Sequence, residues 1–159
     1  MRIAIGSDHA GYELKHRLKL ELGALGHEVV DFGTGAASPP VEYPDFCFPV
    51  AEGVARGAFE RGIVLGGSGI GESIAANKVA GVRAAVVTSD ETARLTRLHN
   101  DSNVLALGAR TNGDFDNAVR WLRLWLDTGF EGGRHVARLR KIHEYERRHR
   151  ALDPAAEPR

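Results

Sequence analysis

The stretch GIVLGGSGIGES, residues 62–73, places a short apolar run directly before a glycine-rich loop. Residues 62–65 (GIVL) have the composition of a buried strand, and residues 73–79 continue with the pattern of a helix. A strand, a tight turn and a helix in this order form the basic unit of a parallel α/β sheet. Ligands bind at the carboxyl ends of the strands in such sheets, so the stretch indicates both a fold class and a candidate binding loop.

The same alternation runs along the rest of the chain. Strands are expected over residues 3–5, 28–32, 62–65, 82–87 and 104–107. Helical periodicity runs from Leu14 to Leu25 and over residues 45–59, 73–79, 90–99, 115–126 and 134–148. This alternation predicts right-handed βαβ crossovers and a parallel sheet with helices on both faces. We expect one domain over residues 1–150 and a loose tail over residues 151–159.

The bulk composition is that of an ordinary globular protein. Of the 159 residues, 43% are hydrophobic and 26% are charged, and the formal net charge is zero. Because this balance gives no general attraction to nucleic acids or anionic membranes, neither partner is expected. No apolar run reaches the length of a membrane span, and the first residues lack the features of a signal peptide. The single cysteine, Cys47, excludes an internal disulfide, so a reducing, cytoplasmic location is expected.

The glycine loop resembles a nucleotide-binding P-loop with one charge reversed. Residues 66–73 match G-x-x-x-x-G-K-[ST] except at the lysine, where this chain has Glu72. A carboxylate would repel nucleotide phosphates, which disfavours ATP binding, and the dinucleotide pattern G-x-G-x-x-G is absent. Glycines at 66, 67, 69 and 71 allow backbone N–H groups to converge on an anion near a helix N-terminus. We therefore predict an oxyanion or phosphate cradle, with a simple tight turn as the alternative.

Glu72 has two explanations from sequence alone. An acid in the first turn of a helix stabilises it by about 0.3–1 kcal/mol, which is sufficient reason for a glutamate there. A carboxylate beside an anion cradle is also what carbon-acid chemistry requires, with a base to remove a proton and N–H donors to hold the resulting oxyanion. Ser68 could add a hydroxyl to that cradle.

Other polar residues are candidates for the same crevice. If the first and third strands flank the point where strand order reverses, Asp8 and His9 face the loop Gly67–Gly71. Asp8 could equally cap the first helix. His99 is a candidate acid–base group, although turn chemistry alone explains Asn100.

The basic residues near the C-terminus have two explanations as well. Arg134 and Arg138 are four apart on one helix face and could bind a phosphate together with Arg110. A solvated basic face is the alternative. The run HEYERRH, residues 143–149, has Arg147 where a zinc-protease helix needs its second histidine, so no metal site is predicted.

Five motifs in order resemble the sugar-phosphate isomerase family that includes ribose-5-phosphate isomerase B and galactose-6-phosphate isomerase. They are SDHAG at 7–11, EYPDF at 42–46, GGSGIGESIAANK at 66–78, HNDSNVLALGAR at 99–110 and EGGRHVAR at 131–138. The resemblance implies a three-layer α/β/α Rossmann-like fold with a five-stranded parallel sheet. It also implies a homodimer or a dimer-based tetramer with the active site at the subunit interface, and no cofactor.

The resemblance also implies roles for individual residues. Glu72 would be the base, and Gly67–Gly71, with Ser68, Gly69 and Ile70 among them, would hold the enediolate oxygen. His99 would open the sugar ring with help from Asp8. The remaining expected contacts are Tyr43 as a pocket wall, Asn100 at the sugar, and His9, Arg110, Arg134 and Arg138 at the phosphate. Some family members have a cysteine base where this chain has Gly66, which leaves the whole base role with Glu72.

The sequence hypothesis is therefore an aldose–ketose isomerase of the pentose phosphate pathway, acting on D-ribose 5-phosphate through an enediolate. The nearest alternative is an isomerase of allose 6-phosphate, galactose 6-phosphate or a four-carbon sugar phosphate. A nucleotide- or RNA-binding module that uses the cradle and the basic last helix is a third hypothesis.

Overall fold

The computed structural model describes residues 1–149, so the predicted tail at 151–159 lies outside the described residues. The strands are β1 (Arg2–Ser7), β2 (Glu28–Asp31), β3 (Arg61–Gly66), β4 (Ala84–Val86) and β5 (Val104–Gly108). The helices of this part are α1 (Tyr12–Ala24), α2 (Pro44–Ala55), α3 (Ile70–Ala76), α4 (Asp90–Asn100), α5 (Phe115–Asp127) and α6 (Arg134–His149). Strands and helices alternate up to α5, as the sequence pattern predicts.

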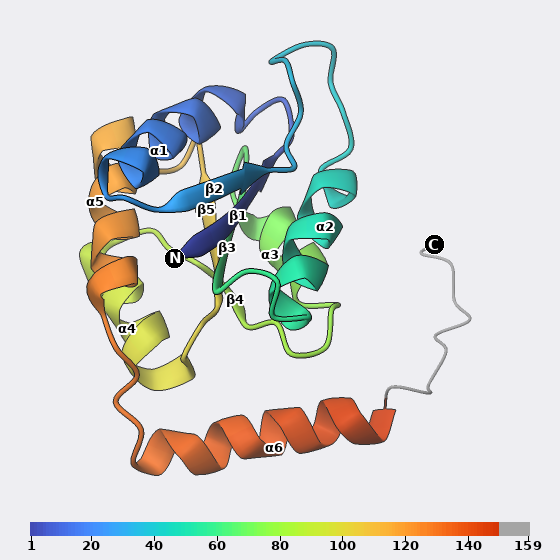
Figure 1. Ribbon diagram of the computed structural model, residues 1–159, viewed down its shortest axis with the longest axis vertical. Coiled ribbons are helices and arrows are strands. Elements are labelled where there is room, and N and C mark those ends of the chain that lie inside the picture. The colour runs from blue at the N-terminus through green and yellow to red at the C-terminus, as the bar shows by residue number, and fades with distance from the viewer. Residues whose placement is uncertain (150–159) are drawn as a thin grey trace.

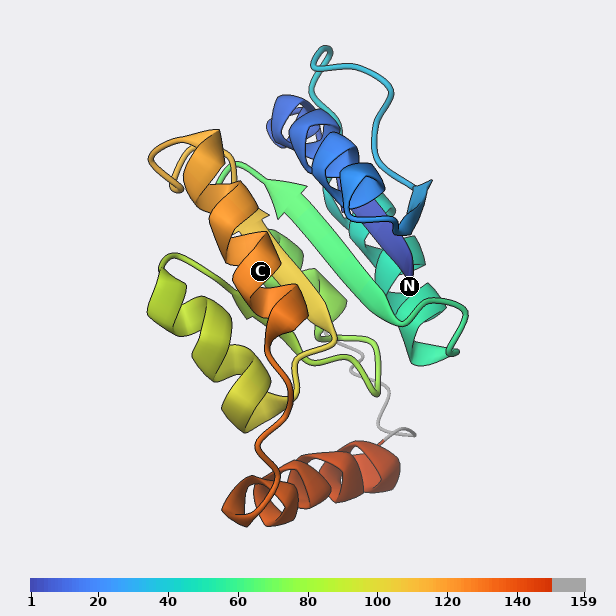
Figure 2. The same cartoon turned by 60° about the vertical axis from the view of Figure 1, so that its left-hand side comes forward.

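The strands form one parallel sheet in the order β2-β1-β3-β5-β4. Helices α1, α4 and α5 cover one face, and α2 and α3 cover the other (Figures 1 and 2). Helix α6 stands apart from both layers, across the end of the sheet where the strands begin (Figure 1). The expected three-layer α/β/α fold with a five-stranded parallel sheet is confirmed.

Side-chain alternation along the central strands produces two separate cores. Ile63 and Leu65 in β3 pack with α1 and α5, whereas Val64 between them packs with α2 and α3. In β5, Leu105 faces the first core and Ala106 the second. Since both faces of these strands are covered, they read in sequence as unbroken apolar runs.

Several predicted boundaries differ from the structure by a few residues. The fourth strand covers only Ala84–Val86, because the backbone N–H of Arg83 bonds to the Asn103 side chain at 2.8 Å and not to a strand partner. Helix α2 ends at Ala55, since Gly57 (φ 73°) reverses the chain. Helix α3 begins three residues before the predicted start at Ser73, which brings the second half of the glycine loop into its first turn.

Within residues 1–149, no helix combines the length and apolar character needed to cross a bilayer.

Candidate active site

The loops that follow β3 and β5, with Tyr43 at the start of α2, surround a cavity of about 460 Å³ at the carboxyl edge of the sheet. The sheet order puts β2 and β3 on opposite sides of β1, so the strand order reverses between β1 and β3. The Asp8 backbone N–H donates to the Leu65 carbonyl at 3.3 Å, which joins the end of β3 to the loop after β1 at that point. Asp8 and His9 therefore lie beside the cavity but do not line it. The lining residues are Tyr43, Gly67, Ser68, Gly71, Glu72, Arg110 and Thr111.

The glycine loop needs its glycines for both conformation and space. Gly69 has φ 78°, and a Cβ there would lie 3.0 Å from the Leu107 backbone. A Cβ on Gly71 would lie 2.9 Å from the ring of Tyr43, so the tyrosine packs directly on the loop. The Ser68 hydroxyl accepts a hydrogen bond from the Ile70 N–H at 3.2 Å, while the Ile70 side chain is exposed. Ile70 therefore belongs to the site only through its backbone.

Glu72 lies in the first turn of α3 and is only 4% exposed. Its carboxylate occupies the space that Gly66 leaves, because any Cβ on Gly66 would collide with Glu72 Oε1. Burial raises the pKa of Glu72, and the nearby negative charge of Asp8 raises it further, while the backbone amides of Glu72 and Gly69 oppose the shift. A carboxylate with a raised pKa is a stronger base than one in water.

Asp8 and His9 are fixed at the other side of the crevice. Asp8 Oδ1 accepts from the backbone N–H groups of Ala10 at 2.9 Å and Gly11 at 3.0 Å, so it closes the turn before α1, whereas the N-cap of that helix is Gly11 without a side-chain bond. Its second oxygen lies 3.9 Å from His9 Nδ1. His9 Nδ1 accepts from the Val41 N–H at 3.2 Å, so a neutral His9 carries its proton on Nε2. Asp8 therefore combines two backbone hydrogen bonds to Oδ1 with a second oxygen, Oδ2, that accepts no hydrogen bond within residues 1–149.

Arg110 reaches the cavity from the loop after β5. Its backbone N–H donates to the Gly67 carbonyl at 3.0 Å, and its side chain lies over Gly67, with Nη1 3.5 Å from the position that a Cβ would take. A guanidinium at this point adds positive charge to a cradle already made of backbone N–H groups.

Four predicted residues lie at the other edge of the sheet, away from this cavity. His99 and Asn100 end α4, and Arg134 and Arg138 lie in α6. Because α4 runs back against the strands, its end lies at the amino edge of the sheet. The five residues of β5 alone span about 13 Å between the two edges, at roughly 3.3 Å per residue. Within one chain, the candidate base and the candidate ring-opening acid are thus at opposite edges.

The turn that presents His99 and Asn100 is held by charged side chains. Asp101 has φ 43°, and its carboxylate accepts from Arg97 Nη1 at 2.7 Å and from Arg83 Nη2 at 3.0 Å. Arg97 is 4% exposed and also donates to the Ser102 carbonyl at 2.6 Å. This network keeps the end of α4 in one conformation.

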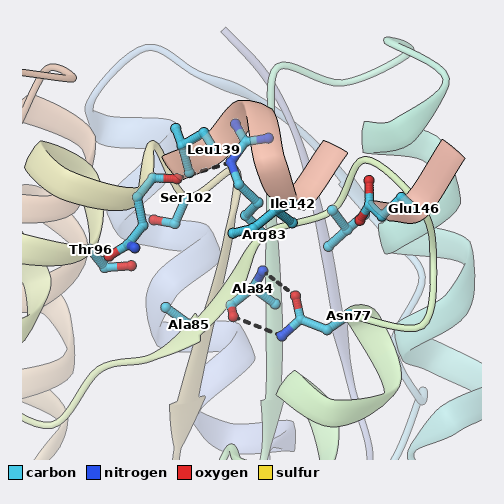
Figure 3. Close-up of a pocket in the computed structure, with 11 residues that line it drawn as sticks. Asn77, Arg83, Ala84, Ala85, Thr96, Ser102, Leu139, Ile142 and Glu146 are labelled. Atoms are coloured by element: carbon cyan, nitrogen blue, oxygen red, sulfur yellow. Dashed lines mark hydrogen bonds between the residues drawn. The ribbon is translucent and has the colours of Figure 1, made fainter. Parts of the chain in front are cut away.

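A second cavity of about 330 Å³ lies between α6 and the body of the protein (Figure 3). Leu139, Ile142 and Glu146 border it from α6, and the Asn77 amide pairs with both backbone polar groups of Ala84 (Figure 3). Asn100 lines this cavity and not the one that contains Glu72.

Among residues 1–149, one group has the composition of a metal site: His99, Glu131 and His135. The two imidazole rings are stacked, with centroids 4.3 Å apart and planes at 12°. Their in-plane lone pairs therefore run nearly parallel and do not converge on one ion. The Arg134 Nε also lies 3.5 Å from His135 Nε2, where a cation would be repelled. The donors do not fit a metal ion in this arrangement.

Sequence reasoning missed three residues of this region. Thr111 lines the first cavity but follows Arg110 in a run with no motif of its own. Glu131 and His135 surround His99, although they are separated from it by the whole of α5. Their position in the motif EGGRHVAR was the available signal.

Comparison with known proteins gives consistent matches. Residues 3–142 match the sequence model of a family described as Ribose/Galactose Isomerase. The chain is 44% identical over 147 residues to ribose-5-phosphate isomerase B of Escherichia coli (strain K12), an alignment that covers 92% of this chain and 97% of that protein. Among solved structures, ribose-5-phosphate isomerase B of Clostridium thermocellum has a TM-score of 0.90 and 51% identity, with 94% of this chain and 99% of that one covered. The Mycoplasma genitalium enzyme with bound ribulose-5-phosphate has a TM-score of 0.88 and 40% identity, with coverage of 92% and 96%.

The buried carboxylate of Glu72 predicts a dependence of stability on pH. Its folded pKa is raised above the ordinary 4.5, so the folded state disfavours the ionised form. The stability that this group contributes is present at pH below 4.5 and is lost as pH rises through the folded pKa. Glu72→Gln keeps the shape of the side chain and cannot ionise, so the variant does not lose stability as the pH rises. We expect the variant to have a higher Tm than the wild type at pH 7.5, with the difference shrinking toward pH 4.

Calorimetry across this pH range checks the expectation. Glu52→Gln is the matched control. Glu52 is exposed on α2, so this substitution removes an equal charge from a position where the carboxylate is not buried. A Tm for Glu72→Gln that equals or falls below that of the wild type at pH 7.5 would contradict it.

Proposed function

The chain belongs to the Ribose/Galactose Isomerase family, and we propose that it interconverts D-ribose 5-phosphate and D-ribulose 5-phosphate. One observation carries the proposal. The Glu72 carboxylate is buried beside a glycine cradle, in a cavity large enough for a sugar phosphate. The ribulose-5-phosphate bound to a relative with a TM-score of 0.88 supports the substrate class.

Glu72 would act as the base in both directions. It removes the proton from C2 of the open-chain aldose and returns a proton to C1 of the resulting cis-enediolate. The negative charge on the enediolate oxygen is held by backbone N–H groups of Gly67–Gly71 and by the Ser68 hydroxyl. The raised pKa of Glu72 suits both steps, because the group must first accept the proton and then release it.

The remaining candidates would bind and prepare the substrate. Tyr43 limits the cavity on the side of Gly71, and Arg110 supplies positive charge above Gly67. His9, Arg134 and Arg138 join Arg110 at the phosphate, His99 opens the furanose ring with help from Asp8, and Asn100 contacts the sugar. Binding energy at the phosphate, remote from C1 and C2, can be used to position the reacting carbons.

The positions of these residues support an assembled site. Glu72 and His99 lie at opposite edges of the same sheet, so one chain cannot bring both to one sugar. A homodimer, or a tetramer built from dimers, would bring His99, Asn100, Arg134 and Arg138 of one subunit to the cavity of the other. We propose such an assembly, with one domain over residues 1–150, no cofactor and a cytoplasmic location. The single buried cysteine suits a reducing compartment.

A six-carbon sugar phosphate is the nearest alternative substrate, since the family description includes galactose isomerase. Both sugars present the same C1 and C2 to Glu72 and differ in the distance to the phosphate. Rates with ribose 5-phosphate, allose 6-phosphate and galactose 6-phosphate distinguish them.

The first functional prediction concerns Glu72. Wild-type protein incubated with ribose 5-phosphate in deuterated water should form ribulose 5-phosphate and incorporate deuterium at C1 of the ketose and C2 of the recovered aldose. Glu72→Gln should lower kcat by roughly 10²–10⁴-fold, the usual contribution of a positioned base. Glu52→Gln is the control. Absence of turnover by the wild type would overturn the substrate assignment, and an active Glu72→Gln would overturn the base assignment.

The second prediction concerns the shared site. Glu72→Gln and His99→Asn should each be weakly active on ribose 5-phosphate. Subunits of the two variants, mixed in equal amounts and allowed to exchange, should recover about a quarter of wild-type activity, because half of the dimers are mixed and one site of each is intact. If each site lay within one chain, mixing would recover nothing.

The third prediction concerns the phosphate. Arg138→Ala should raise KM for ribose 5-phosphate by roughly tenfold or more, as expected for loss of a charge-assisted bond to a phosphate. Arg140→Ala removes an equal charge from the same helix and serves as the control. Equal KM values for the two variants would assign Arg138 to a solvated basic face.

A further inference from the structure

We propose that Glu131 is a positioning residue for His99, whose carboxylate keeps the His99 imidazole oriented for opening of the sugar ring. The inference rests on the proposed function of His99 and extends it to a residue that the cavity does not contain. It begins from the contacts around His99 at the amino edge of the sheet.

One carboxylate oxygen faces both imidazoles of this region. Glu131 Oε2 lies 3.6 Å from His99 Nε2 and 3.5 Å from His135 Nε2. The His135 ring is stacked on the His99 ring at 4.3 Å. The His99 ring therefore contacts the His135 imidazole on one face and the Glu131 carboxylate at Nε2.

The backbone fixes Glu131 independently of its side chain. Its N–H donates to the Leu98 carbonyl at 3.0 Å, one residue before His99, so both residues are attached to the same turn of α4. Gly132 and Gly133 follow with φ 73° and 54°, conformations that favour glycine, and reverse the chain into α6. His135 then returns over His99. This glycine turn holds all three side chains together.

The charges of the cluster make Glu131 the counter-ion of His99 and not of His135. Two stacked imidazoles cannot both be charged without strong repulsion, and His135 is 2% exposed, which disfavours its charged form. Burial and the charge of His99 lower the pKa of His135, and Arg134 and Arg138 lower it further, against the opposing effect of Glu131. His99 is the more exposed of the two rings and keeps Glu131 as its counter-ion.

Ring opening needs a proton donor at the ring oxygen, whereas proton transfer at carbon does not. Ribose 5-phosphate is mainly a furanose, and its ring oxygen must be protonated as the ring opens. Ribulose 5-phosphate has no furanose form, because the oxygen on C5 that would close the ring carries the phosphate. Loss of a positioning residue for His99 should therefore slow the interconversion of the two sugars more than the exchange of the C1 proton of ribulose 5-phosphate with solvent.

The experiment measures isomerisation and solvent exchange separately in the assembled protein. Glu131→Gln should lower kcat/KM for ribose 5-phosphate by roughly tenfold, as for other residues that orient a functional histidine. Because the equilibrium constant fixes the ratio of kcat/KM in the two directions, the value for ribulose 5-phosphate should fall by the same factor. Exchange of the C1 proton of ribulose 5-phosphate with deuterated water, which Glu72 can carry out without ring opening, should change less than about twofold. Glu144→Gln is the control, because Glu144 lies on α6 and pairs with Arg148 at 3.8 Å, away from His99.

A second measurement is independent of catalysis. The ring resonances of His99, assigned with His99→Asn, should change chemical shift at a fixed pH in Glu131→Gln, and Glu144→Gln should not change them. Equal losses of isomerisation and of C1 exchange, or unchanged His99 resonances, would overturn the positioning role. If the His99 resonances differ between wild type and Glu131→Gln as expected but the wild type turns over neither sugar, the proposed function is overturned and the Glu131–His99 pairing stays in place.

Discussion

The candidate site depends on a steric fit between a glycine and a carboxylate. Gly66 ends β3 without a side chain, and the Glu72 carboxylate occupies the space that a Cβ would fill. The side chain therefore turns back toward the end of the strand and is shielded from water. A P-loop lysine points outward to a phosphate, whereas the Glu72 side chain points inward to Gly66. The reversed charge at this position therefore goes with a reversed direction of the side chain. The glycine is as necessary to this base as the glutamate itself.

This burial has a cost that the rest of the fold must offset. A carboxylate with a raised pKa is destabilised in its ionised form, which is the form that accepts a proton. Two apolar cores, one on each face of the sheet, hold β3 and α3 in place around it. Residues such as Val64 and Leu65, adjacent in sequence but on opposite faces, fix the position of Gly66 from both sides. A site of this kind requires rigid strands on either side of the loop.

The fold could be predicted from the sequence because its signals are local. Runs such as residues 62–65, the leucine stripe of α1 and the glycine loop each follow from periodicity or turn chemistry. The short fourth strand could not be predicted, since its length depends on a side-chain bond between Arg83 and Asn103 across a turn.

The proximity of some site residues could likewise be predicted from the sequence, and that of others could not. Asp8, Ser68, Glu72 and Arg110 follow strands whose carboxyl ends meet, so their proximity could be expected from the topology. The partners of His99 could not, because Glu131 and His135 approach it only through the path of the chain after α5. Gly66 illustrates a different limit. In the sequence it is one glycine among several in the loop, whereas the structure gives it a steric role that no local pattern contains.

The separation of Glu72 from His99 has a physical reason beyond topology. The proposed base, Glu72, is strengthened by burial and by a neighbouring negative charge, Asp8, which raise its pKa. The proposed ring-opening acid, His99, has different surroundings, since it is more accessible to solvent and has Glu131 as a counter-ion. Each environment is built by the contacts at its own edge of the sheet, so the two can be set separately within one chain. The proposed twofold assembly would then bring each acid to the partner's base, twice in every dimer.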